Sequence, residues 1–153
     1  MIAQTTNYQP TVLVVARGGR YGAFLREALE REGYAVELAH DREHGLRRVL
    51  AGGIDLVVLR QRASDAGSAR WCRRLAALHR GGYLPVIVLA ERERGAPLAV
   101  GLADGVAAHL TRPLDVPELL RQVRIWTEAR ERLRAFYARL LRAVEVSTEA
   151  TCA

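Results

Sequence analysis

The chain has 153 residues, of which 50% are hydrophobic and 26% are charged, a composition that suits one globular domain with a sizeable core. No apolar run approaches the roughly 20 residues that cross a bilayer, and the first ten residues do not resemble a signal peptide, so we expect a cytoplasmic protein. Two cysteines are too few for a disulfide framework. The net charge is +6, but the basic residues form no dense block, which disfavours nucleic-acid binding.

Short apolar runs alternate with amphipathic segments in chain order. The apolar runs predict five strands: 11–15, 35–39, 54–59, 84–90 and 106–111. Apolar residues at helical spacing predict a helix after each strand: 20–32, 42–51, 68–80, 96–105 and a long one from about 117. Asp41 can cap the second helix, and Gly33 is placed to end the first.

This alternation predicts an α/β fold with a parallel sheet that is covered on both faces. We expect a flavodoxin-like, doubly wound sheet of five strands in the order 2-1-3-4-5, with an extended C-terminal helix. Ligands of such folds bind at the carboxyl ends of the strands, near the point where the strand order reverses. That position predicts a crevice lined by Ala16, Arg17, Arg60 and Arg62.

Several stretches carry a resemblance to a known family: VLVVARGGRYGAFLREALEREGYAVELA, AGGIDLVVLR, WCRRLAAL, LPVIVLAE and GLADGVAAHLTRPLDVPELLRQVR. Through them the sequence from Thr11 to about Arg130 resembles the receiver domain of bacterial two-component response regulators. The last stretch is the most specific. The resemblance implies a signalling domain rather than an enzyme, with residues 1–10 as an N-terminal tail and residues 11–129 as the receiver-like domain.

The resemblance also implies a phosphorylation site, from which this chain departs at five positions. Receivers have two acidic residues after strand 1 that hold a divalent metal, and an aspartate at the end of strand 3 that accepts a phosphoryl group. A Thr or Ser ends strand 4, and a Lys precedes the strand 5 proline. The corresponding residues here are Ala16, Arg17, Arg60, Ala90 and Arg112. A common aromatic position in strand 5 is His109.

These replacements predict the loss of phosphoryl transfer. Magnesium is held by carboxylates and other hard oxygen ligands, which the replacement residues lack. Phosphoryl transfer also needs an acceptor oxygen, whereas an arginine is not a nucleophile and remains protonated. We therefore expect a degenerate receiver, or pseudo-receiver, with no catalytic residue, no metal and no cofactor.

The arginines of the crevice allow two interpretations. Arg17, Arg60, Arg62 and Arg112 could form a site for an anion such as a phosphate, a nucleotide or a carboxylate of a partner. Alternatively, each arginine pairs with a nearby acid, since a buried unpaired charge is costly. The acids within reach lie on neighbouring loops: Asp41, Asp65, Glu91 and Glu93. We favour local pairing, with Arg60 and Glu91 as the preferred pair.

The last predicted helix continues beyond the end of a receiver domain. Its apolar residues follow an alternating 4-3 spacing, interrupted only by Arg130: Leu119, Val123, Trp126, Leu133, Tyr137, Leu140 and Val144. Residues 130–146 have no sheet left to cover, so their apolar stripe predicts a partner, and a two-helix coiled coil is the simplest one. The alternative is that this extension folds back onto its own domain. Residues 147–153 are expected to be a disordered tail.

We expect a homodimer whose interface includes Trp126, Leu133, Tyr137, Leu140 and Val144, helped by the face that receivers form from helix 4, strand 5 and helix 5. The predicted function is a phosphorylation-independent module for protein interaction and dimerisation in bacterial signal transduction. The expected partner is a protein, such as a histidine kinase, a transcription factor or another signalling protein. We expect no binding to a membrane. Two alternatives remain: sensing of an anion, nucleotide or nucleic acid through the crevice, and a conventional phosphorelay regulator with an unusual site.

Overall fold

The computed structural model describes residues 8–62, 67–79, 83–91 and 105–151. Five parallel strands form one sheet in the order β2-β1-β3-β4-β5, which confirms the predicted fold class and strand order. The strands are β1 Thr11–Val15, β2 Ala35–Ala39, β3 Leu56–Gln61, β4 Val86–Ala90 and β5 Ala108–Thr111. The described helices are α1 Gly19–Arg31, α2 Arg42–Leu50, α3 Gly67–Leu78 and α4 Val116–Thr151. Of the helix predicted at 96–105, residues 96–104 lie outside the described residues.

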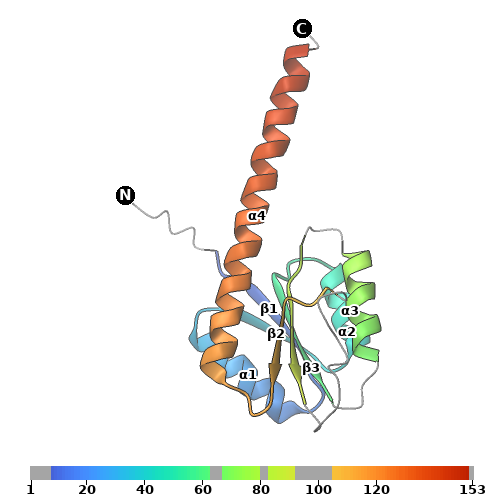
Figure 1. Cartoon of the computed structure of the whole chain (residues 1–153), viewed down its shortest axis with the longest axis vertical. Helices are drawn as coiled ribbons and strands as arrows, with labels where there is room; N and C mark the ends of the chain where they lie inside the picture. Colours follow the sequence, from blue (N-terminus) through green and yellow to red (C-terminus); the bar gives the residue numbers. More distant parts are fainter. Residues whose placement is uncertain (1–7, 63–66, 80–82, 92–104, 152–153) are drawn as a thin grey trace.

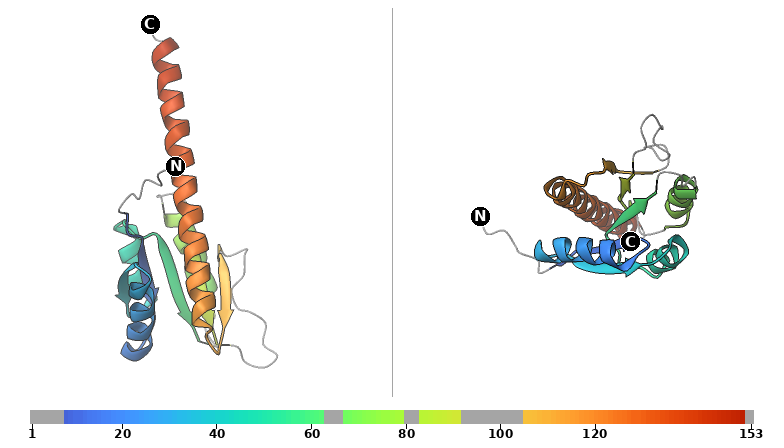
Figure 2. Two further views of the ribbon diagram at one scale, coloured as in Figure 1. Left: turned by 90° about the vertical axis from the view of Figure 1, so that its left-hand side faces the viewer. Right: turned by 90° about the horizontal axis from the view of Figure 1, so that it is seen from below.

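Helices cover both faces of the sheet (Figures 1 and 2). On one face, α1 and α4 bury four large apolar side chains against the strands: Leu25, Leu29, Leu119 and Val123. On the other face, α2 and α3 bury five side chains against the strands: Leu46, Val49, Trp71, Cys72 and Leu75. Burial on both faces explains why the central strands are apolar along nearly their whole length.

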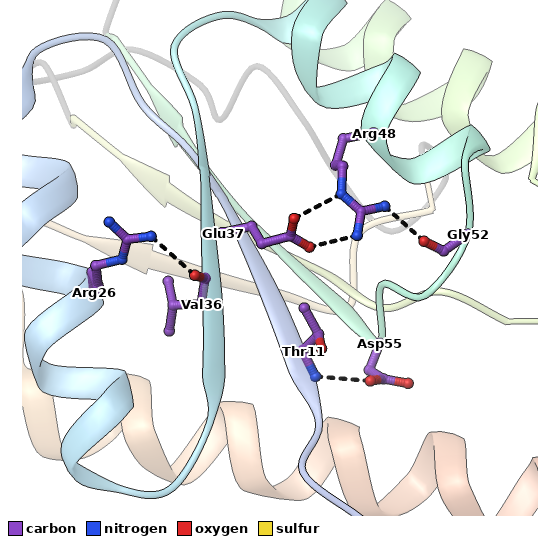
Figure 3. Close-up of polar contacts among 7 residues, drawn as sticks. All are labelled: Thr11, Arg26, Val36, Glu37, Arg48, Gly52 and Asp55. Carbon is purple, nitrogen blue, oxygen red and sulfur yellow. Dashed lines mark hydrogen bonds and ion pairs between the residues drawn. The ribbon is translucent and has the colours of Figure 1, made fainter.

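The edge strand β2 is held to its neighbouring helices by arginines (Figure 3). Arg48 of α2 donates two hydrogen bonds to the Glu37 carboxylate, at 2.8 and 2.7 Å, and a third to the Gly52 carbonyl at 2.7 Å. Arg26 of α1 donates to the Val36 carbonyl at 3.2 Å. The bidentate pair is half exposed, so it positions α2 more than it stabilises the fold. The last turn of α2 is thereby held against the middle of β2.

A buried carboxylate joins α4 to the amino-terminal edge of the sheet. Asp55 precedes β3 and is 5% exposed, and its Oδ2 accepts a hydrogen bond from the Thr11 backbone at 2.8 Å (Figure 3). Its Oδ1 accepts hydrogen bonds from Tyr8 and from Nη1 of Arg130, the latter at 2.6 Å. Arg130 Nε also donates to the Tyr83 carbonyl at 3.1 Å. The arginine that interrupts the apolar spacing of α4 is therefore the residue that fastens this helix to the domain.

Beyond Arg130, α4 leaves the domain and continues as a straight helix into solvent (Figure 1). Leu133, Tyr137, Leu140 and Val144 are 40 to 60% exposed, so the extension does not fold back onto its own domain. No helix among the described residues is both long and apolar enough to span a membrane.

The expectation of a disordered tail from residue 147 is wrong for residues 147–151, which continue the helix. No glycine or proline ends the helix there. The hydroxyl groups of Thr148 and Thr151 instead donate hydrogen bonds to the carbonyls of Val144 and Ser147, at 2.9 and 2.6 Å. These back-bonds occupy the hydroxyl groups within the helix and allow short polar side chains to extend it.

Candidate functional site

A crevice lies at the carboxyl ends of β1 and β3, at the edge of the sheet opposite the helical extension. β1 and β3 pair in parallel with Val15 opposite Leu59, and the chain turns into α1 at Gly18, whose φ of 90° is unfavourable for other residues. The cavity between them has a volume of about 290 Å³. Nine of the described residues line it: Val15, Ala16, Arg17, His40, Asp41, Arg42, Leu59, Arg60 and Arg62.

The structure brings together most of the residues that the sequence placed in the crevice. Ala16, Arg17, Arg60 and Arg62 all line the cavity. β3 is longer at its carboxyl end than predicted, so Arg60 lies within the strand, opposite Leu89 of β4.

The two remaining predicted positions lie at the neighbouring strand ends. Ala90 ends β4 and pairs with Gln61 and Thr111 on its two sides. The backbone nitrogen of Arg112 donates a hydrogen bond to the Ala90 carbonyl at 3.2 Å. Neither Ala90 nor Arg112 lines the cavity.

Arg60 and Arg112 share one acid and one aromatic ring. Arg60 Nη2 is 3.4 Å from Glu91 Oε1, which confirms the predicted pair, and Arg112 Nη1 is 3.5 Å from the same oxygen. The two guanidinium groups lie 4.2 and 5.2 Å from the centre of the Tyr21 ring. An aromatic face attracts cations, so Tyr21 and Glu91 together hold two positive groups that would otherwise repel each other. Asp65 and Glu93, the other acids considered, lie outside the described residues.

Arg60 keeps one donor that this cluster does not use. Its Nε is buried and has no hydrogen-bond partner within the described part of the chain. The side chain as a whole is 17% exposed. A buried N–H without an acceptor is costly, so this donor is a weak point of the cluster.

At the end of β2, sequence reasoning placed only Asp41 within reach of the crevice and overlooked His40 and Arg42. His40, Asp41 and Arg42 follow this strand directly and form one wall of the cavity. The rule that ligands bind at the carboxyl ends of parallel strands could have found them, because β2 is the neighbour of β1. Arg42 is held in place at both ends: its Nη1 donates to Ser68 Oγ at 3.2 Å, and its carbonyl accepts from Trp71 Nε1 at 2.7 Å.

Asp41 is the one carboxylate among the described residues that line the cavity. Its side chain accepts a hydrogen bond from the His44 backbone at 2.7 Å and caps α2 as predicted. That hydrogen bond holds the pKa of Asp41 below its usual value. Magnesium takes oxygen ligands, commonly one or two carboxylates and waters, so a lining of arginines with one engaged carboxylate does not fit a magnesium ion. The described residues also contain no cluster of three His, Cys, Asp or Glu that could hold a metal.

His109 lies on β5, opposite Val88 of β4, and does not line the cavity. Both of its ring nitrogens are buried, and neither has a hydrogen-bond partner among the residues that the structure describes. Burial lowers the pKa of His109, because the charged imidazolium loses hydration. The neutral ring therefore packs as an apolar side chain, and its two nitrogens make no hydrogen bond with the described residues.

The sequence is similar to several response regulators. It is 32% identical over 113 residues to the response regulator MprA of Mycobacterium ulcerans, an alignment that covers 74% of this chain and 48% of that protein. It is 30% identical over 113 residues to the uncharacterized transcriptional regulatory protein YkoG of Bacillus subtilis, with 74% and 49% covered. The chain thus spans about half the length of the curated relatives that it matches. No protein-family model matches the sequence.

Solved structures show the same fold at lower sequence identity. A CheY-like receiver domain from Methanospirillum hungatei superposes with a TM-score of 0.71 and 20% identity, covering 82% of this chain and 98% of that chain. A receiver domain from Clostridium thermocellum superposes with a TM-score of 0.69 and 20% identity, covering 81% and 98%.

Proposed function

Because this chain carries a response-regulator receiver domain of the CheY-like type, we propose that the domain works without phosphorylation, as a module for protein interaction and dimerisation. Its signal is passed on by contact with another protein of two-component signalling, such as a histidine kinase or a transcription factor. The domain holds one conformation of its crevice permanently, because cations fixed in the chain replace the transient metal and phosphoryl group.

The crevice supplies the observation that carries this proposal. At the end of β3, where receivers present the acceptor aspartate, Arg60 fills the space between Glu91 and the Tyr21 ring. After β1, where receivers hold the metal, Ala16 has no ligand atom in its side chain and Arg17 is cationic. Phosphoryl transfer depends on metal ions to neutralise charge on the transferred group. This crevice has neither an acceptor oxygen at Arg60 nor a place for the metal.

A phosphoryl-donor experiment tests this part of the proposal. The full chain is incubated with magnesium and acetyl phosphate, or with magnesium and beryllofluoride, and its mass and thermal unfolding are measured. We expect no covalent adduct and no magnesium-dependent shift in the unfolding temperature. The variant Ala16→Asp/Arg17→Asp/Arg60→Asp restores the acidic pattern and serves as the positive control for magnesium binding. A stable, magnesium-dependent adduct on the unaltered chain would overturn the proposal.

The exposed stripe of α4 supports the dimerisation part. Six large apolar side chains are 40 to 64% exposed along the extension: Leu133, Phe136, Tyr137, Leu140, Leu141 and Val144. A contiguous apolar surface of this kind marks an interaction site, and a second copy of the same helix covers it with matching spacing.

A pair of substitutions tests the dimer. Leu140→Glu places a charge in the stripe, whereas Val146→Glu places the same charge on the opposite side of the helix, where Val146 is 66% exposed. We expect a dimer for the unaltered chain and for Val146→Glu, and a monomer for Leu140→Glu, by sedimentation equilibrium. Equal masses for the two variants would contradict dimerisation through this stripe.

Anion binding is a second candidate function, favoured by the arginines that line the crevice, Arg17, Arg42, Arg60 and Arg62. An adjoining hollow of about 430 Å³ shares Arg17 and Arg42 with the crevice and adds Arg70 and Arg74. Guanidinium groups suit phosphate in both shape and charge. If the crevice binds a phosphate group, inorganic phosphate raises the unfolding temperature more than chloride at equal ionic strength, and Arg60→Ala removes the difference. No difference in the unaltered chain would exclude this candidate.

A further inference from the structure

The apolar stripe of the extension lies on the same side of α4 as the domain. Arg130, the last residue that α4 buries against the domain, marks this side. Tyr137, Leu141 and Val144 follow it by 7, 11 and 14 residues. An α-helix has 3.6 residues per turn, so these positions return to within about 40° of the direction of Arg130, whereas Leu133, Leu140 and Phe136 turn away from it by about 60°, 80° and 120°. One edge of the stripe therefore continues the face that packs on the sheet, and the sheet ends where the stripe begins.

This placement restricts how a second copy can cover the stripe. In a parallel pair, the partner helix would lie against the stripe and run side by side with α4 towards residue 116. Alongside residues 116–130, the same side of α4 is occupied by its own sheet, where Leu119 and Val123 are fully buried. A straight partner helix in that position would pass through the domain. A parallel coiled coil along this stripe is thus excluded unless α4 bends.

We propose that two copies pair through this stripe in an antiparallel arrangement, with the end of each helix close to the base of the other domain. This inference rests on the dimerisation proposed above and adds its orientation. In an antiparallel pair, the domain of the second copy lies beyond residue 151 of the first copy, so it does not meet the sheet of the first. The 21 residues from 131 to 151 span about 32 Å at 1.5 Å per residue, which is the length available for pairing.

The charges of the extension agree with this orientation. Its first part carries one acid, Glu131, and four arginines: Arg132, Arg134, Arg139 and Arg142. Its last part carries two acids, Glu145 and Glu149, and no arginine. A parallel pair places like charges and aligned helix dipoles beside each other. An antiparallel pair brings the acidic, dipole-negative end of each helix near the arginine-rich start of the other; this is an attraction between whole helix ends, since Arg132 and Arg139 lie on the side of the helix away from the stripe.

The base of the domain offers a place for the arriving helix end. A hollow of about 420 Å³ lies at the amino-terminal edge of the sheet, and its lining includes Arg130 and Arg134 of α4. The apolar side chains of Leu50 and Leu78 also line it and are 50% and 43% exposed. In the antiparallel dimer this hollow faces the C-terminal end of the partner helix. Leu50, Leu78 and Arg134, which line the hollow, then contact that helix end. The two receiver domains lie at opposite ends, so the predicted contribution of the helix 4, strand 5 and helix 5 face is not part of this dimer.

Distances between spin labels distinguish the orientations. Single cysteines replace Arg132, Arg139 or Val146, which follow one another by seven residues and lie on the side of the helix away from the stripe. All variants also carry Cys152→Ser, and Cys72 is kept because it is buried. In the antiparallel dimer, equivalent labels at 132 and 146 are offset by about 20 Å along the axis for a pair centred near residue 139. We expect the shortest distance at 139 and clearly longer ones at 132 and 146.

The outcomes of this experiment separate the orientation of the dimer from its existence. Equal distances at all three positions show a parallel pair and overturn the orientation while leaving dimerisation intact. No dipolar coupling at any position, together with a monomer mass by sedimentation, overturns both the orientation and the proposed dimer. The labelled positions are exposed, and circular dichroism of each variant checks that the helix content is unchanged.

Discussion

Individual side chains determine what the crevice can do. One carboxylate, Glu91, lies between two guanidinium groups, those of Arg60 and Arg112, so the three charges do not cancel. Tyr21 lies beneath both cations and supplies the remaining attraction. The arginines of the crevice are therefore positioned by specific neighbours, which makes Arg60 a structural element of the site as well as a replacement for an acceptor.

Replacing His109 by an apolar residue is predicted to stabilise the protein. His109→Phe is expected to raise the free energy of unfolding by about 1 kcal/mol at pH 8, because the two buried ring nitrogens have no partner among the described residues and an apolar ring avoids their desolvation. Urea denaturation of the two proteins measures the difference. A less stable variant at pH 8 would show that the nitrogens of His109 are hydrogen-bonded.

The same substitution should change the dependence of stability on pH. Burial lowers the pKa of His109 from its ordinary value of 6.5, so the unfolded chain binds a proton before the folded chain does as the pH falls. The unaltered protein accordingly loses stability below about pH 6.5, whereas His109→Phe does not lose this contribution. The stability difference between the two proteins is expected to be larger at pH 5 than at pH 8, and an unchanged difference contradicts the buried neutral ring.

The Asp55–Arg130 pair is the second residue-level prediction. Asp55→Ala is expected to lower the free energy of unfolding by about 3 kcal/mol, because it leaves the buried Arg130 guanidinium without its carboxylate. Adding Arg130→Met removes the stranded charge, so the double variant should cost less than the two single variants together. Strictly additive costs in urea denaturation would show that the two side chains do not interact.

At the scale of the element, α4 consists of two parts: a core helix of the domain and an exposed extension. Up to Arg130 it is a core helix of the domain. Beyond Arg134, which is 3.8 Å from Asp55, its side-chain hydrogen bonds among the described residues stay within the helix. Ending the chain after Ala135 is expected to leave the domain folded and monomeric. The free energy of unfolding should change by less than about 0.5 kcal/mol when measured at concentrations where the full chain is also monomeric. Sedimentation and thermal unfolding measure both properties, and a truncated chain that unfolds would show that the extension supports its own domain.

At the scale of the whole molecule, the crevice and the extension lie at opposite edges of the sheet. The crevice is at the carboxyl ends of the strands, and α4 leaves the domain beside Asp55 and Tyr83, at the amino-terminal edge. Figure 1 shows how far the extension projects from the domain. We expect the dimer dissociation constant to be unchanged by magnesium and acetyl phosphate, since the crevice has no means of using them. A shift of tenfold or more in sedimentation experiments would show that the crevice controls the dimer.

Much of this architecture could be predicted because its signals are local in the chain. The apolar runs and helical stripes predicted all five strands and their order, and Asp41 was correctly expected to cap α2. The ends of elements were less predictable. β3 runs to Gln61 because its last residues pair with β4, and residues 147–151 stay helical because nothing in their sequence ends the helix.

The sequence by itself determined the alternation of strands and helices and which residue types line the crevice, since hydrophobic period and residue identity are properties of neighbours in the chain. Only the tertiary structure decided that Arg60 and Arg112 share Glu91 and Tyr21, and that His40 and Arg42 form a wall of the cavity. It also decided that Arg130 meets Asp55, 75 residues away in sequence, and so which side of α4 faces the domain. The spacing of a stripe follows from the sequence, but its direction relative to the sheet depends on packing between distant parts of the chain.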